Sequence, residues 1–528
     1  MKVLILTGKL AYPLVKKQAK NSNIDTIVHM VDNTQVAAFL TPSKIINDIK
    51  KNVDLKDIDL ILTPGLMRKQ TTEITEELKI PTFKGSTDAA DLKTVLDSLE
   101  DLELSESKAA DKLIEEKKRQ QAFEYIHNYE NNQEQIKELL KKPNNILVRN
   151  LPVGDDFPMR VLGEIANAPS LSKDELINKA KYFVSSGADM IDIGMLAGED
   201  NSDKISEIIK TLRPIVGDKP LSIDTLSSKE IITAVKEGVD LVLSMDHGNC
   251  DKILPTLEKY QIPAVLLPTN YSEGFVPHTS IERINSMKKL VERAKNIPVI
   301  CDLVLDPVNS SSIVESIYSY NEFHKEIKYP MFFGVGNVVE LMDTDSVGAN
   351  ALLAGISMEI GASILFTPEE SPKTVGSIHE LAIASRMMFL AKKRQSIPKD
   401  LGINLLVFKD KHKSYNIEEN HHIPTEKAKE SLKFKRDPEG SFKIQVIHGN
   451  NINESKITAT HFKKTKPTIT ITGKYAKEIY DEIIKRQLIT RLDHAAYIGS
   501  ELEKAEIALK LRKNYIQDFD LFQEPLQL

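Results

Sequence analysis

The sequence is poor in the residue types that form crosslinks, thiolate metal sites and stacking surfaces. Its 528 residues include two cysteines, Cys250 and Cys301, no tryptophan, 14 tyrosines and 17 phenylalanines. Two cysteines exclude a disulfide scaffold and a zinc site with four thiolates. The shortage of aromatic residues disfavours a groove in which ligands stack on rings. Because such a cysteine content is typical of a reducing compartment, we expect a cytoplasmic protein.

The chain also lacks an excess of positive charge. It has 70 Lys and Arg residues against 76 Asp and Glu residues, which gives a net charge of -6. Nucleic acids and anionic membranes are bound through basic surfaces. We therefore expect neither to be a partner of this protein.

Long uninterrupted apolar runs are missing as well. The first eight residues, MKVLILTG, are typical of a β-strand and not of a signal peptide. Residues 347–366 approach the length of a membrane helix, but they contain Asn350 and Glu359 and are divided by Gly361. This pattern predicts a buried helix over 347–360 and a buried strand over 362–367.

The composition along the chain predicts three folded domains joined by two connectors. Strands alternate with helices over residues 1–104, which predicts a small Rossmann-like α/β domain, although no G-x-G-x-x-G dinucleotide motif is present. Residues 105–145 are dense in charge and predict a solvated helical connector. A polar, lysine-rich connector with the pair His421-His422 is expected over 396–440, and a small α+β domain over 441–528.

The strongest structural signal lies in residues 146–395. Short apolar strands are predicted to start near positions 160, 190, 220, 241, 263, 297, 330 and 362, and an amphipathic helix follows each one. Eight β–α units of roughly 30 residues are the size and number found in a TIM (β/α)8 barrel. We therefore predict an α/β protein with a central TIM barrel.

Carboxylates follow most of these predicted strands. In such barrels the site lies at the carboxyl ends of the strands, where His247 is the one basic candidate. The excess of acidic over basic side chains at the strand ends disfavours a phosphate-rich ligand. It favours a metal ion or a ligand with N–H donors, such as a 2-amino-4-oxo-pyrimidine edge. Capping of the next helix and metal binding remain open alternatives for each residue. The six carboxylates are Glu164, Asp192, Asp224, Asp246, Asp306 and Glu369.

Three segments resemble the successive signatures of the pterin-binding barrel family. They are residues 187–194 (GADMIDIG), 221–225 (LSIDT) and 305–307 (LDP). That family includes dihydropteroate synthase and methyltetrahydrofolate-dependent methyltransferases, and with its flanking domains the chain resembles the archaeal dihydropteroate synthase-related proteins. The resemblance implies a reduced pterin as substrate or cofactor, with Asp224 and Asp306 binding its aminopyrimidine edge. It also implies that Asp192 braces the site and ranks with the catalytic residues.

The sequence departs from dihydropteroate synthase in four loops. The long N-V-T-P-D-S-F loop is replaced by residues 167–171 (NAPSL), and the G-G-E-S-T-R-P loop by residues 194–198 (GMLAG). The seventh-strand S-R-K and the eighth-strand R-x-H are replaced by residues 336–338 (GNV) and 366–368 (FTP). In the synthase these groups hold pyrophosphate and the arylamine. The resemblance therefore implies that the residues that bind the pterin are retained, whereas the residues that bind pyrophosphate and the arylamine in the synthase are not.

Two other segments resemble the methyltransferase branch. Residues 163–167 (GEIAN) are similar to its G-E-x-x-N first strand, which implies that Glu164 and Asn167 contact the pterin. Gly336-Asn337 is similar to its seventh-strand Ser-Asn, which implies that Asn337 stabilises the protonated N5 leaving group as a catalytic residue. We include Asp246 among the pterin-binding residues, and we predict no metal-ligating residue. The corrinoid motif D-x-H-x-x-G is absent, so a corrinoid would be carried by a partner protein.

Together these features predict a transferase that acts on a reduced pterin in tetrahydromethanopterin- or folate-type C1-carrier metabolism. One version condenses a dihydropterin methyl diphosphate with an arylamine and uses Mg²⁺. The alternatives are a methyl-tetrahydropterin-dependent methyltransferase and a non-catalytic pterin-binding subunit of a complex. Barrels of this family often pair, so a homodimer is also expected.

Overall fold

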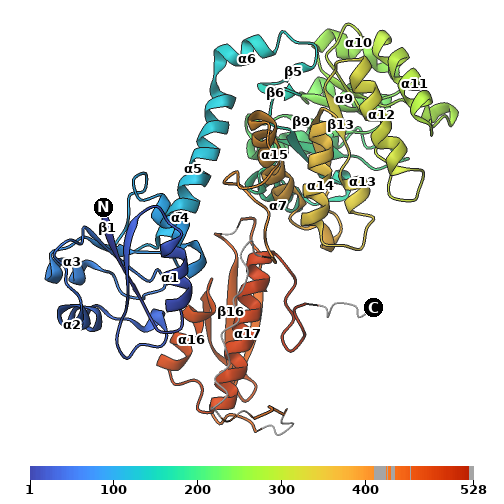
Figure 1. Ribbon diagram of the computed structural model, residues 1–528. Helices are drawn as coiled ribbons and strands as arrows, with labels where there is room; N and C mark the ends of the chain where they lie inside the picture. The colour runs from blue at the N-terminus through green and yellow to red at the C-terminus, as the bar shows by residue number, and fades with distance from the viewer. Residues whose placement is uncertain (410–423, 425, 430–434, 452, 523–528) are drawn as a thin grey trace. The chain divides into compact units, whose positions relative to one another are not determined.

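The computed structural model describes residues 1–409, 424, 426–429, 435–451 and 453–522, and the chain forms two compact units (Figure 1). One unit contains Met1–Tyr129 and Lys399–Lys427, and the other contains Glu130–Pro398 and Ala428–Leu528. The pair His421-His422 lies outside the described residues.

The first unit is built on a parallel four-stranded sheet with the order β2-β1-β3-β4. Side chains of β1 alternate between the two faces, so that Val3 and Ile5 join one buried cluster while Leu4 and Leu6 join another. A parallel sheet covered on both faces by helices requires such apolar strands. The strands are β1 (Lys2–Thr7), β2 (Asp25–Met30), β3 (Leu60–Thr63) and β4 (Thr82–Lys84), and the helices are α1 (Tyr12–Lys20), α2 (Pro42–Asn52), α3 (Thr72–Leu78), α4 (Leu92–Asp97) and α5 (Ala110–Asn131).

The second unit contains a closed barrel of eight parallel strands, which confirms the predicted TIM barrel. The order is β10-β11-β12-β13-β14-β7-β8-β9, so the chain closes the barrel by pairing β14 with β7. The strands are β7 (Arg160–Ile165), β8 (Met190–Gly194), β9 (Leu221–Asp224), β10 (Leu241–Met245), β11 (Ala264–Leu266), β12 (Val299–Cys301), β13 (Met331–Phe333) and β14 (Ala362–Thr367).

Helices connect successive strands of the barrel. They are α7 (Lys173–Ser186), α8 (Ile205–Val216), α9 (Ser228–Glu237), α10 (Cys250–Tyr260), α11 (Ser280–Arg293), α12 (Ile313–Glu326), α13 (Gly336–Val339), α14 (Ser346–Glu359) and α15 (Ser377–Arg394). The predicted helix and strand at 347–367 are present as α14 and β14, and β14 is buried as expected. Helix α14 is buried on one side only, since Leu352 is 67% exposed, so the prediction of a buried helix is wrong in that respect. No helix among the described residues has both the length and the apolar character needed to span a membrane.

Helix α7 shows how the local sequence determines these connections. Ser172 and Glu175 form a capping box at its start, and Gly187 ends it in the left-handed conformation with φ of 102°. Leu176, Ala180 and Phe183 form the buried stripe that packs against the strands.

A short hairpin that the sequence analysis did not predict covers the amino-terminal end of the barrel. It consists of β5 (Asn145–Val148) and β6 (Leu151–Gly154), which pair in antiparallel fashion. Val148 and Val153 are fully buried in one cluster with the barrel residues Leu162, Met190 and Leu241. The hairpin does not cover the opposite end of the barrel, where the strands have their carboxyl ends. We call this end the mouth, and the candidate site lies there.

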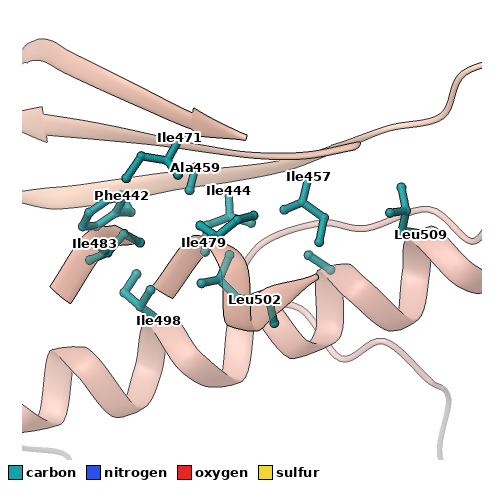
Figure 2. Packing of buried hydrophobic residues seen from close by; sticks show 12 residues of the cluster. Phe442, Ile444, Ile457, Ala459, Ile471, Ile479, Ile483, Ile498, Leu502 and Leu509 are labelled. Carbon is teal, nitrogen blue, oxygen red and sulfur yellow. The ribbon is translucent and has the colours of Figure 1, made fainter. Parts of the chain in front are cut away.

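The C-terminal part of this unit is an antiparallel sheet with the order β15-β16-β17, covered by two helices. Figure 2 shows Phe442, Ile444 and Ile471 of the sheet facing Ile479 and Leu502 of the helices. The elements are β15 (Ser441–Ile447), β16 (Lys456–Lys463), β17 (Lys466–Gly473), α16 (Ala476–Lys485) and α17 (Leu492–Leu511).

Candidate functional site

Three carboxylates from adjacent barrel strands converge at the mouth. Glu164 of β7 is paired in register with Asp192 of β8, and Gly194 of β8 is paired with Asp224, the last residue of β9. One carboxylate oxygen from each acid lies within 4.8 Å of the others. We call Glu164, Asp192 and Asp224 the carboxylate triad.

Asp192 is the innermost member of the triad and is fully buried, with an exposed fraction of 0%. The hydroxyl of Ser222 donates a hydrogen bond to its Oδ1. Its Oδ2 is also buried but has no hydrogen-bond partner among the described residues. Burial, reinforced by the charges of Asp224 and Glu164, raises the pKa of Asp192 well above its usual value.

Glu164 occupies space that a glycine provides. A Cβ atom added at Gly194 would overlap Oε1 of Glu164 and would lie 3.1 Å from the Cα of Ala166. The absence of a side chain at position 194 therefore permits the Glu164 carboxylate to reach the triad.

We expect Gly194→Ala to displace the Glu164 carboxylate and to weaken any ligand that the triad binds. The barrel should survive the change, because the nearest blocking atom is the far end of the Glu164 side chain and the Ala166 Cα needs to shift by only a few tenths of an ångström. Ligand titration would measure the loss of affinity, and thermal unfolding would measure any loss of stability. Gly198→Ala is not a suitable control, because Gly198 has φ of 79°, which an alanine rarely adopts. Gly348→Ala in α14, where nothing lies near the added atom, is the matched control. Unchanged ligand binding in Gly194→Ala would contradict this packing argument.

The triad holds protons near neutral pH. Burial raises the pKa of Glu164 to about 8, the charges of Asp224 and Glu370 add to the shift, and Lys179 opposes it. Burial and the charge of Asp302 raise the pKa of Asp224 to about 7. Such carboxyl groups can accept hydrogen bonds when ionised and can donate a proton when neutral.

Asp302 is a fourth acid near the triad, and the sequence analysis missed it. It directly follows β12, accepts hydrogen bonds from the Tyr320 hydroxyl at 2.5 Å and the Val304 amide at 2.8 Å, and is largely buried. Burial raises its pKa to about 6, and its charge in turn raises the pKa of Asp224. Its position as the first polar residue after an apolar strand was the signal that could have identified it.

Asp306 does not directly follow the strand that starts near position 297, as the sequence predicts, because that strand, β12, ends at Cys301. Asp306 lies farther along the loop, where its Oδ2 pairs with Nη2 of Arg283 at 2.6 Å and accepts the Ser316 hydroxyl at 2.9 Å. Arg283 is 2% exposed. Asp306 therefore balances a buried guanidinium in this structure, and the structure does not bring it into the triad.

Asp246 is also occupied by local hydrogen bonds. Its Oδ1 accepts the amides of Gly248 and Asn249, and its Oδ2 accepts the Tyr271 amide and the Thr269 hydroxyl. This buried carboxylate organises the loops after β10 and β11 and lies outside the triad.

Glu369 is committed to the start of α15. It accepts the amides of Gly376 and Ile378 together with the Tyr182 hydroxyl. This arrangement is the helix-capping alternative that the sequence left open.

The two predicted asparagines occupy different positions at the mouth. Nδ2 of Asn337, in α13, donates to the Leu305 carbonyl at 3.0 Å and so borders the loop that begins with Asp302. Asn167 lies just beyond β7, exposed and in the left-handed conformation with φ of 53°.

Tyr271 brings an aromatic ring near these acids, which the sequence analysis did not predict. It lies in the loop after β11 and its side chain is half-exposed. Burial, followed by the charges of Asp246, Asp302 and Asp224, raises the pKa of its hydroxyl. The mouth therefore combines clustered carboxyl groups with one ring face, a combination suited to a flat ligand that carries N–H donors.

Two family models match the chain. The one described as "Pterin binding enzyme" matches residues 166–350, which include Asp192, Asp224 and Asp302. The one described as PterinBD-DUF4346 matches residues 436–518, the C-terminal sheet and its helices.

Known proteins similar to this chain cover it to different extents. An uncharacterized protein of Methanocaldococcus jannaschii is 46% identical over 536 residues, which span 99% of each chain. A folate synthesis bifunctional protein of Arabidopsis thaliana is 24% identical over 139 residues, which are 22% of this chain and 29% of that protein. The solved Yersinia pestis dihydropteroate synthase with a pterine-sulfa conjugate is 17% identical, covers 47% of this chain and 99% of that chain, and has a TM-score of 0.39.

Proposed function

Because this chain belongs to the dihydropteroate synthase-related family of pterin-binding proteins that includes the M. jannaschii relative, we propose that it is a transferase acting on a reduced pterin. The proposal places the pterin at the mouth of the barrel and its chemistry in tetrahydromethanopterin- or folate-type C1-carrier metabolism. Asp224 and Asp302 accept the N–H groups of the aminopyrimidine edge. Asp192, the buried acid of the neighbouring strand, supports the position of Asp224.

The observation that supports this proposal is the placement of two acids at the mouth, Asp224 as the last residue of β9 and Asp302 directly after β12. The 2-amino group and the ring N–H of a pterin point in nearly the same direction, so one carboxylate can accept both. A second carboxylate nearby can accept the remaining amino N–H. The half-exposed ring of Tyr271 offers an apolar contact for the flat pterin.

The raised pKa values favour methyl transfer as a second candidate for the reaction. A methyl group on the N5 tertiary amine of a reduced pterin leaves readily only if that nitrogen becomes protonated. The pKa of Glu164, about 8, keeps a proton on the site at neutral pH. In this version Asn337 stabilises the protonated nitrogen, and a corrinoid protein partner would accept the methyl group.

Condensation with an arylamine requires a diphosphate to approach the same mouth. Four acids there repel an anionic substrate, so this version needs a cation such as Mg²⁺ to bind with it. A non-catalytic pterin-binding subunit would retain the pterin contacts without either reaction.

Calorimetric titration of the full chain with a reduced pterin tests the proposal. We expect one pterin site per chain, with an affinity that falls as the pH rises above about 8, because ionisation of Glu164 then removes the proton held beside the ligand. Repeating the titration with pyrophosphate and Mg²⁺ separates the versions. Tighter pterin binding supports condensation, and unchanged binding supports methyl transfer or a carrier role. The absence of any pterin binding would overturn the proposed function.

A further inference from the structure

We propose that the carboxylate triad of Glu164, Asp192 and Asp224 binds a divalent metal cation of the Mg²⁺ or Mn²⁺ type. This inference goes beyond pterin binding, because the cation site is formed by the protein's own oxygens and needs no pterin.

The geometry of the triad fits a hard cation. Mg²⁺ takes oxygen ligands at about 2.0–2.1 Å and Ca²⁺ at about 2.3–2.6 Å, so two ligand oxygens on one such ion lie roughly 3–5 Å apart. The triad presents three such oxygens within 4.8 Å of one another. They come from three neighbouring strands of a closed barrel, which fixes their backbone positions.

A second observation points to a ligand at this position. Oδ1 of Asp192 accepts a hydrogen bond from the Ser222 hydroxyl, whereas Oδ2 is buried and finds no partner in the part of the chain that the structure describes. A buried carboxylate oxygen without a partner is costly, and either a cation or a hydrogen-bond donor relieves that cost. Asp192 is fully buried and contributes one oxygen to the triad, so an ion bound there lies beside the carboxylate that carries the unpartnered Oδ2.

The charge balance distinguishes a cation from a neutral pterin. The triad and Asp302 carry up to four negative charges, and Lys179, the basic group whose charge acts on Glu164, is ion-paired with Glu370. A neutral pterin brings hydrogen-bond donors but no charge. A dication neutralises two of these carboxylates, and it leaves Asp302 and the second oxygen of Asp224 for the pterin edge.

A bound cation would also change what the mouth can accept. Basic side chains are scarce at the strand ends, so a dication would supply the positive centre that an anionic co-substrate needs. The proposed cation site does not depend on whether the reaction is condensation with an arylamine or methyl transfer.

Titration of the full chain with Mn²⁺ alone, followed by electron paramagnetic resonance of the free ion, tests the inference. We expect one Mn²⁺ per chain, with at least a tenfold loss of affinity in Glu164→Gln and in Asp192→Asn. Asp343→Asn, which removes an exposed carboxylate in the loop after α13, should bind Mn²⁺ like the unaltered protein.

The inference is overturned if the unaltered protein binds no stoichiometric Mn²⁺ or if both triad variants, shown by circular dichroism to be folded, bind it undiminished. Asp302→Asn separates this result from the proposed function. That variant should lose pterin affinity and retain Mn²⁺, because Asp302 lies outside the triad. Mn²⁺ binding without pterin binding would therefore leave the cation site standing while the proposed function fails.

Discussion

Replacing Asp224 or Asp302 by Asn should weaken the binding of a reduced pterin by a factor of about 100, equivalent to about 3 kcal/mol. The Asn side chain keeps the shape of Asp but loses its charge and presents an NH2 group where the pterin edge donates. The donor on the ligand is then left unpaired in a partly dehydrated site. Calorimetric titration of each variant with the same pterin measures the effect.

Asp343→Asn again serves as the control, because this exposed carboxylate lies at the surface and pairs with Lys373. Its pterin affinity should match that of the unaltered protein. If Asp224→Asn and Asp302→Asn both bind the pterin with full affinity, the ligand does not occupy the mouth as proposed.

Replacing Asp306 by Ala should instead destabilise the fold by about 3 kcal/mol, because it removes the counter-ion of a buried guanidinium. Arg283 would keep its hydrogen bonds to the Leu303 carbonyl and the Ser316 hydroxyl, but it would lose its direct ion-pair partner at 2% exposure. Urea unfolding followed by circular dichroism measures the loss.

Asp251→Ala is the comparison variant, because it removes the acid of an exposed ion pair, whereas Asp306→Ala removes the acid of a buried one. Asp251 is largely exposed and pairs with Arg293 at the surface, so its removal should change the stability little. A stable Asp306→Ala variant that has lost pterin binding would restore the sequence-based role of Asp306 and would remove the argument for Asp302.

The barrel strands could be predicted because each is an apolar run of limited length followed by a helix. Strand β12 shows where that signal fails. Apolar residues continue through Leu303 and Leu305 after the strand has ended at Cys301, so hydrophobicity alone extends the strand by several positions. The backbone turns at Val304, which has φ of 66°, a conformation that no pattern predicts for a β-branched residue.

The candidate site was harder to predict than the strands. Asp246 and Glu369 follow strands just as Asp224 does, and the sequence cannot distinguish a carboxylate that accepts nearby amides from one that faces a ligand. Only the three-dimensional arrangement shows that Asp246 accepts four hydrogen bonds. The raised pKa of Glu164 likewise depends on burial and on charges that lie far away in the sequence.

The close approach of Glu164 to Gly194 has a consequence for how this protein can evolve. The two positions are sterically coupled, although they lie thirty residues apart in the sequence. A side chain at position 194 and the present placement of the Glu164 carboxylate exclude each other. We therefore expect an acid at position 164 to occur together with glycine at position 194 in related sequences, which an alignment of homologues would test.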